Sequence, residues 1–389
     1  MRAASSFIAF FLSLAAVAPL GGAVDVASCS EFEAVDRKTE TEVTITTADF
    51  ACDEYTRLSI RSSMVLKSSV GAVTFSNLGL KVYGSLTVEP DVVFTGITLA
   101  DKSGAALALE LGAVAVFQGT ANFENISVQP RNEGARIYRK GAAISSQGSL
   151  TFEKDATFTG CTNEAQDGEA YDEAGEILYD ASSGGGGAVY QRAKGTMHFM
   201  GKLTMTNNEA DSYFDANRGE GGAFYNKGDV VVDGEATFSE NIGQEGGAIF
   251  QTTWGTFTFN GFATFEKNTA WNQRGGAIAN YGGEMTFTAG TSFDDNTANS
   301  TGDGGLGGGI FNYNGGVVTL DGPNSFTNNW AYGGGAIYNM VNPDYTFEAY
   351  GEGDYVAPIL AYPDDTIFEG NEAENCPDVG YSFEDCRSA

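Results

Sequence analysis

The chain has 389 residues, and its 51 Asp and Glu residues outweigh 21 Lys and Arg residues to give a net charge of −30. This balance excludes nucleic acid and anionic membranes as partners, because their phosphates attract basic surfaces. The length and the 52 glycines also argue against one ordinary globular core. They favour stacked repeats, in which each unit packs only on its neighbours.

The N-terminus carries the pattern of a secretory signal peptide. Arg2 precedes an apolar run from Phe7 to Leu20, and the small residues 21–23 follow as a cleavage site. The run is shorter than the roughly 20 residues that cross a membrane as a helix. We therefore expect residues 1–23 to be removed, no stable membrane span, and a mature protein that is secreted or held at a cell surface.

The cysteines are placed unevenly along the chain. Four of them flank the repeats in two pairs: Cys29 and Cys52 before, Cys376 and Cys386 after. Outside a cell, each pair could close one end of the fold as a disulfide, although sequence alone leaves the connectivity open. Cys161 is left over. It has no basic neighbour in sequence, so we expect a buried, unreactive thiol.

Residues 24–58 are predicted to form an N-terminal cap, and residues 374–389 a C-terminal cap or tail. Between residues 59 and 373 one pattern recurs nine times: a glycine, then alternating apolar residues, then an aromatic residue. The first positions are Gly84, Gly112, Gly148, Gly195, Gly228, Gly255, Gly283, Gly316 and Pro343, and the last positions are Phe94, Phe123, Phe158, Met205, Phe238, Phe265, Phe293, Phe326 and Phe368. A fixed unit with variable spacers predicts a solenoid.

Each copy contains short strands separated by turn residues. In the copy at residues 246–270, strands are expected at 247–250, 256–260 and 262–265, because apolar residues alternate there. The inward pairs of the second strand are predicted to be Leu86/Val88, Val114/Val116, Leu150/Phe152, Met197/Phe199, Val230/Val232, Phe257/Phe259, Met285/Phe287, Val318/Leu320 and Tyr345/Phe347. Three strands per unit are too few for a propeller blade. They predict an all-β fold, a single-stranded right-handed parallel β-helix of about nine coils.

An asparagine column lies three residues after the aromatic column. It comprises Asn208, Asn241, Asn268, Asn296, Asn329 and Asn371, and the same place earlier holds Ile97, Ile126 and Cys161. Asparagine tolerates a left-handed turn, and stacked side chains can hydrogen-bond from coil to coil. We predict an internal asparagine ladder at one corner of the coil.

These segments resemble a known family. The pairing of Gly247-Ala248-Ile249 with Phe265…Asn268, repeated from about Gly184 to Ala373, is similar to the GGAI and FxxN repeats of chlamydial polymorphic outer membrane proteins. The resemblance implies a right-handed β-helix at a cell surface, often linked with adhesion. Those proteins are autotransporters with a C-terminal membrane barrel, and no barrel-length segment is expected here after the repeats.

The same fold class also includes polysaccharide lyases and glycoside hydrolases, which act with paired carboxylates. The candidate residues here are Glu266, Asp294 and Asp295, next to one another if the coils stack. The companion motifs Gly-His-Gly and Arg-x-Lys are missing, so we favour a non-enzymatic protein and keep the enzyme as the alternative. No cofactor is expected beyond weak Ca²⁺ binding at such oxygen-rich turns.

A threonine column suggests a second alternative, ice binding. The outward places of the second strand are Thr87, Ala115, Thr151, His198, Val231, Thr258, Thr286, Thr319 and Thr346. Regular threonines on a flat face can order water, but carboxylates such as Asp229 and Glu284 flank this column, and threonine is also simply favoured in strands. The single histidine, His198, is expected to be a surface residue without a partner.

Two insertions interrupt the stack, at residues 162–183 and 340–363. Loops on a rigid scaffold often carry recognition. We therefore expect a scaffold or adhesin whose insertions contact an extracellular glycan or protein. Asn125 and Asn299 lie in N-glycosylation sequons. The oligomeric state stays open.

Overall fold

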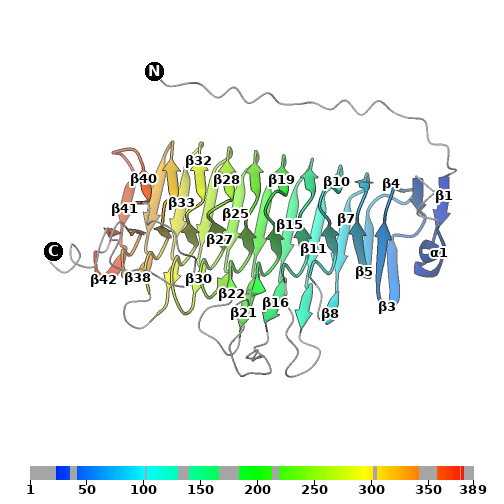
Figure 1. Cartoon of the computed structure of the whole chain (residues 1–389), viewed down its shortest axis with the longest axis horizontal. Helices are drawn as coiled ribbons and strands as arrows, with labels where there is room; N and C mark the ends of the chain where they lie inside the picture. Colours follow the sequence, from blue (N-terminus) through cyan, green and yellow to red (C-terminus); the bar gives the residue numbers. More distant parts are fainter. Residues whose placement is uncertain are drawn as a thin grey trace, which may run out of the picture.

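The computed structural model describes residues 23–35, 42–100, 103–129, 140–165, 184–212, 219–300, 305–340, 357–376 and 378–380. The strands of these residues pair in parallel, and successive windings lie side by side in a long rod (Figure 1). The predicted parallel β-helix is confirmed. Its right-handed sense and the number of nine coils stay predictions.

Each winding has three faces, which we number in chain order. The first face comprises β1 (Ala23–Val26), β2 (Glu42–Ile45), β4 (Ser63–Ser68), β6 (Ser85–Val88), β10 (Val114–Phe117), β14 (Ser149–Phe152), β19 (Thr196–Phe199), β24 (Asp229–Val232), β28 (Thr256–Phe259), β32 (Glu284–Phe287), β36 (Val317–Leu320) and β40 (Ile359–Ala361).

The second face carries the aromatic column. It comprises the first parts of β3 (Asp49–Ile60) and β5 (Val73–Val82), then β7 (Val92–Thr95), β11 (Ala121–Glu124), β15 (Ala156–Thr159), β20 (Leu203–Thr206), β25 (Ala236–Ser239), β29 (Ala263–Glu266), β33 (Thr291–Asp294), β37 (Asn324–Thr327) and β41 (Ile367–Glu369).

The third face carries the GGAI segments. It comprises the last parts of β3 and β5, then β9 (Leu107–Leu109), β13 (Ile144–Ser146), β18 (Val189–Gln191), β23 (Phe224–Asn226), β27 (Ile249–Thr252), β31 (Ile278–Tyr281), β35 (Ile310–Tyr313), β39 (Ile337–Asn339) and β43 (Val379–Gly380).

A fourth set of strands, not expected from the sequence, joins the second face to the third. This short edge comprises β8 (Thr98–Ala100), β12 (Ser127–Gln129), β16 (Thr162–Ala165), β21 (Glu209–Ser212), β26 (Ile242–Gly243), β30 (Thr269–Ala270), β34 (Thr297–Ala298), β38 (Trp330–Gly333) and β42 (Glu372–Asn375). β17 (Gly184–Gly185) and β22 (Gly219–Glu220) pair separately.

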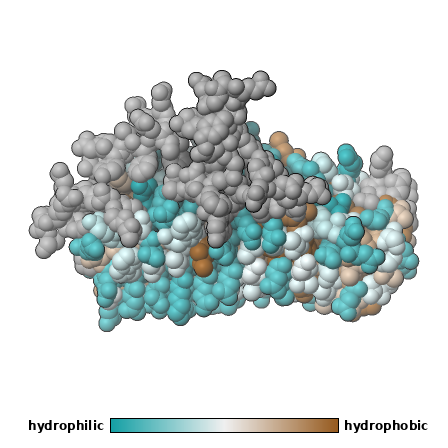
Figure 2. All heavy atoms as spheres, turned by 90° about the horizontal axis from the view of Figure 1, so that it is seen from below, coloured by the Kyte–Doolittle hydropathy of each residue, from teal (hydrophilic) through white to brown (hydrophobic). Residues whose placement is uncertain are grey.

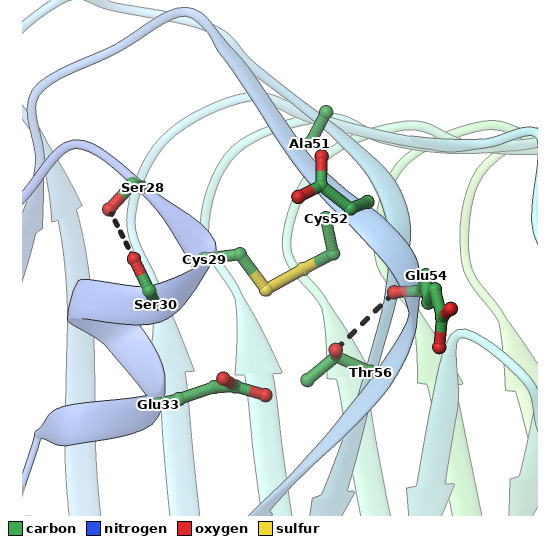
Figure 3. Close-up of a pocket in the computed structure, with 9 residues that line it drawn as sticks. Ser28, Cys29, Ser30, Glu33, Ala51, Cys52, Glu54 and Thr56 are labelled. Carbon is green, nitrogen blue, oxygen red and sulfur yellow. Dashed lines mark hydrogen bonds between the residues drawn. A yellow bond between two sulfur atoms is a disulfide. The ribbon is translucent and has the colours of Figure 1, made fainter.

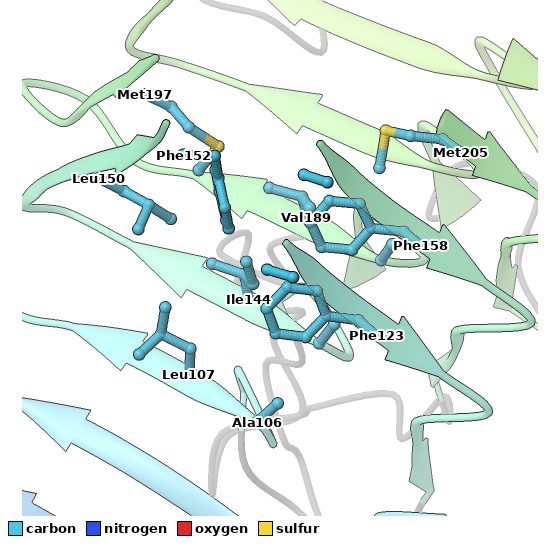
Figure 4. Close-up of a cluster of buried hydrophobic side chains, with 14 of the residues drawn as sticks. Ala106, Leu107, Phe123, Ile144, Leu150, Phe152, Phe158, Val189, Met197 and Met205 are labelled. Atoms are coloured by element: carbon cyan, nitrogen blue, oxygen red, sulfur yellow. The ribbon is translucent and has the colours of Figure 1, made fainter. Parts of the chain in front are cut away.

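Equivalent inward side chains lie over one another in files. The ring of Phe265 stacks 5.0 Å from that of Phe238 and 4.6 Å from that of Phe293, centroid to centroid. Figure 4 shows Phe123 and Phe158 in the same file, beside the aliphatic file of Ile144 and Val189. The core therefore consists of parallel stacks of side chains along the rod. The spacing within each stack is set by the distance between neighbouring strands.

One copy was assigned to the wrong face. Ala115 and Phe117 point inward and are fully buried, whereas Val114 is 43% exposed, so the predicted inward pair Val114/Val116 is wrong. This copy has one extra residue between Gly112 and its aromatic residue. Because side chains alternate along a strand, a shift of one residue exchanges the two faces.

The ends of the stack also differ from the expected boundaries. β2 already pairs with β4, and β3 pairs with β5 with one register shift between Ala51 and Thr56, so the coil begins within residues 24–58. α1 (Cys29–Ala34) closes that end, with Phe32 packed on Phe50. β16 shows that residues 162–165 continue the coil. In the last copy β36 pairs with β40, so Leu360 takes the inward place expected for Tyr345, which lies outside the described residues.

The corner between the second face and the short edge holds the asparagine file. The left-handed φ falls on the residue before each asparagine, as at Asn207, Glu240 and Lys267 (φ 54 to 55°). This turn aims the next side chain inward, where Asn268 Nδ2 donates to Asn296 Oδ1 (2.9 Å) and to the Phe238 carbonyl (3.0 Å). Equivalent bonds link the members of the column from Asn208 to Asn371.

A second buried amide file, not expected from the sequence, lies at the end of the third-face strands. Its members are Gln191, Asn226, Gln251, Asn280, Asn312 and Asn339. Asn280 Nδ2 donates to Asn312 Oδ1 (2.9 Å), and Asn312 Nδ2 donates to Asn339 Oδ1 (2.8 Å). The signal was present in the sequence as an Asn or Gln two places after the apolar residue that ends each GGAI-like segment from Val189 to Ile337.

Replacement of Asn268 by alanine should destabilise the rod. Asn268→Ala removes the acceptor of the Asn241 amide and one donor to the Phe238 carbonyl, both in the buried interior. We expect the free energy of unfolding in urea to fall by about 3 kcal/mol or more. The control is Asn260→Ala, whose exposed side chain bonds Asp233, and which should cost about 0.5 kcal/mol or less. Equal effects would contradict the ladder's role.

Cys161→Asn should lengthen the ladder by one coil. The Cys161 thiol lies 3.6 Å from the Phe123 carbonyl, and its backbone N–H already donates to Asn208 Oδ1 (3.0 Å). An asparagine here meets the partners that later members have, so unfolding should cost about 1 kcal/mol more. Cys161→Ala removes packing without adding bonds and should be less stable than the wild type. If the asparagine variant is no more stable than the alanine variant, the prediction is wrong.

Candidate functional site

The candidate carboxylates lie together where the second face ends. Glu266 and Asp294 are register neighbours on β29 and β33, and Asp295 follows in the left-handed turn (φ 56°). Glu266 pairs with Lys267 at 2.6 Å, and this hydrogen bond raises the pKa of the lysine. Asp294 Oδ1 accepts from Thr327 Oγ1 (2.7 Å) and Asn328 Nδ2 (3.0 Å). Two of the three carboxylates are therefore held by neighbours, and the third forms the turn.

A pocket in the described residues lies elsewhere, at the N-terminal end. It has a volume of about 340 Å³ and lies between α1 and β3, against the Cys29–Cys52 disulfide (Figure 3). Glu33, Asp53 and Glu54 line it together with hydroxyl side chains. None of Glu266, Asp294 and Asp295 lines this pocket, so it gives the candidate carboxylates no enclosed substrate site.

His198 has a partner, contrary to expectation. On the first face its Nε2 lies 2.7 Å from Asp233 Oδ2, and both side chains are 40% exposed. Partial burial tends to raise the pKa of Asp233, but hydrogen bonds from Asn260 and His198 outweigh it, so the pKa lies below its ordinary value. An ion pair this exposed contributes little to stability.

The first-face threonine column is interrupted. Ala115 is inward rather than in the column. His198 and Val231 separate Thr151 from Thr258, and the adjoining outward column contains Asp229 and Glu284. Thr346 lies outside the described residues. The column is therefore a series of short threonine segments among charges.

Of the remaining residues predicted from the sequence, some are buried, some are exposed, and some lie outside the described residues. Cys29 and Cys52 form a disulfide, Cys376 is disulfide-bonded, and Cys386 lies outside the described residues. Burial raises the pKa of the free Cys161 thiol to about 12, so thiolate chemistry is suppressed. Both sequon asparagines, Asn125 and Asn299, are exposed. Residues 1–22 of the predicted signal peptide are not described.

A buried ionic cluster outside the third face was not predicted. Rings point outward from this face yet are buried in a file that includes Tyr190, Tyr225 and Phe250. The Arg274 guanidinium lies over the ring of Phe311 in the same cluster. Its Nη1 donates to the Tyr281 hydroxyl (2.9 Å) and lies 3.9 Å from Glu245 Oε1. Burial raises the pKa of Glu245, against the opposing attraction of Arg274. The sequence signal was the charged residue just before a Gly-Gly pair.

The described residues show neither a metal centre nor a membrane-spanning helix. No group of three His, Cys, Asp or Glu side chains there could hold a metal ion. α1 has six residues, and no described helix is long and apolar enough to cross a membrane. Seen from below, the described surface over the C-terminal half of the rod is largely hydrophilic (Figure 2).

The raised pKa of Glu245 predicts a pH-dependent effect of Glu245→Gln. The folded state binds this proton more tightly than the unfolded chain does, so the stability that Glu245 contributes is present in acid. It is lost as pH rises through the folded-state pKa. The variant cannot titrate there. We expect the difference in melting temperature, variant minus wild type, to become more positive as the pH is raised from acidic to neutral, measured by circular dichroism. A flat or falling difference would contradict the raised pKa.

Comparison with known proteins agrees with the fold. Residues 325–340, which run from β37 through β38 into β39, match the Chlamydia polymorphic membrane protein repeat. No curated protein and no solved structure matches this chain. The chain is therefore similar, over one repeat unit, to a repeat of chlamydial surface proteins, and its parallel β-helix is consistent with a stack of such units.

Proposed function

We propose that this protein is an exported, non-enzymatic β-helical scaffold or adhesin that contacts a glycan or protein at a cell surface. The repeat match at residues 325–340 supports a surface protein. The proposal rests on one observation: the coil varies widely in length at the corner between the short edge and the third face, whereas both corners of the second face keep a constant length from β6 to β36.

The variable corner joins the short edge to the third face. The connection there has 23 residues between β16 and β18 (166–188), 11 between β34 and β35 (299–309) and 3 between β38 and β39 (334–336). By contrast, the first and second faces are joined by three residues in every coil from β6 to β36, as at 260–262. Loops at the variable corner can differ in length and sequence without disturbing the stacked core. A recognition surface requires this freedom, because its residues must be able to change without loss of packing.

The carboxylates support the non-enzymatic proposal. Glu266 and Asp294 already have neutralising or donating partners, at 2.6 and 2.7 Å. A general acid and base must instead be positioned toward a bound substrate and tuned by its surroundings. The net charge of −30 directs the search toward neutral or basic partners and away from polyanions.

Binding and cleavage should be screened together on arrays of glycans and extracellular proteins. A variant with residues 166–183 replaced by a short Gly-Ser linker should lose binding but keep the wild-type melting temperature. The matched control, Glu266→Gln with Asp294→Asn and Asp295→Asn, should bind as the wild type does.

Two results would overturn the proposal. Release of sugar fragments by the wild type, abolished in the carboxylate variant, would make the protein a lyase or hydrolase. Unchanged binding by the linker variant would place the contact away from this corner.

A further inference from the structure

The outer side of the second face carries a two-column array of hydroxyl groups. We define this hydroxyl array by Thr157 and Thr159 on β15, Thr204 and Thr206 on β20, Thr237 and Ser239 on β25, and the continuation Thr264, Ser292, Ser325 and Thr327. All of these side chains are partly exposed. The threonine column expected from the sequence lies on the first face, and this second array was not predicted.

The array is regular because the strands that carry it pair in a constant register. Thr157 pairs with Thr204 and Thr204 with Thr237, without a register shift. Neighbouring strands lie about 4.8 Å apart, and alternate residues of one strand about 6.7 Å apart, so the hydroxyls form a two-dimensional lattice. The stacked rings of the aromatic column lie directly below, as with Phe238 and Phe265. The support is therefore rigid.

Hydrogen bonds between coils orient some of the hydroxyls. Thr206 Oγ1 lies 3.1 Å from Ser239 Oγ, and Ser325 Oγ donates to Ser292 Oγ at 3.1 Å. A hydroxyl has one donor and two acceptor sites, so even those that donate between coils, such as Ser325, keep acceptor capacity for a ligand. A ligand that meets this surface therefore finds its partners already ordered and loses little free energy in arranging them.

The character of the array selects the ligand. Its first column, from Thr157 to Ser325, holds only hydroxyl side chains across six strands and no charge. No aromatic side chain points outward from these strands, unlike the concave, aromatic-lined sites that bind small molecules. A regular, uncharged column of hydroxyls is complementary to a surface on which hydrogen-bonding oxygens are also regularly spaced.

We propose that the hydroxyl array binds the surface of ice. Water molecules bound between evenly spaced hydroxyls lie at the same even spacing. The oxygen rows of ice repeat at a distance close to that between neighbouring strands, so the bound water can match the crystal. The threonine methyl groups beside them hold water weakly and favour transfer of that water into the crystal. Glu266 and Asp294 interrupt the second column, so both columns together act over β15, β20 and β25.

The test measures thermal hysteresis and inhibition of ice recrystallisation with the full chain. Thr204→Tyr places a bulky ring in the middle of the array, between Thr157 and Thr237. The matched control is Thr258→Tyr, a partly exposed threonine at an equivalent place on the first face. The wild type should inhibit ice growth, the first variant should lose most of that activity, and the control should retain it, at equal melting temperatures.

A gain of function makes the test sharper. Glu266→Thr with Asp294→Thr continues the second column without a break from Thr159 to Thr327, and should increase thermal hysteresis. The proposal is overturned if the wild type leaves ice growth unaffected, or if Thr204→Tyr and Thr258→Tyr reduce it equally. It is also overturned if Thr204→Tyr abolishes binding to insoluble polysaccharide while ice growth is unchanged. These outcomes are independent of the variable corner and its partner.

Discussion

Each winding of this protein depends on its neighbours for the hydrogen bonds of its buried polar groups. The asparagines at the corner after the second face are buried, and their side chains bond to neighbouring coils. Asn268 obtains all its side-chain bonds from the windings on either side. Since a buried amide without a partner is costly, the coils are stable only in register with each other. The aromatic and aliphatic files follow from that register.

This constraint separates the inside of the rod from its outside. Inward places are fixed by stacking, and the corner between the first and second faces keeps three residues in coil after coil. The outside is free to differ from side to side. The variable corner changes length between windings, whereas the outer side of the second face repeats one kind of side chain. A single rod can therefore offer one irregular and one regular surface.

The third face shows how glycine enables a second buried layer. Glycine-rich segments pass over its outward rings, and a Cβ atom at Gly185 would meet the ring of Tyr225 at 2.5 Å. Close approach of backbone to ring is possible only without a side chain. The charged residues before these glycines, Glu245 and Arg274, are then buried beside one another and the rings, where burial raises the pKa of the carboxyl.

The sequence by itself determined the parallel β-helix, the aromatic file and the asparagine column, because these arise from a pattern repeated in every coil. The tertiary structure alone decided what depends on contacts between particular coils. The exposure of Val114, the bond of His198 to Asp233 and the pairing of β36 with β40 join residues that no short-range pattern relates. A single inserted residue reverses a strand's faces, and an insertion hides where the next coil resumes, so the register between windings is fixed only when they pack.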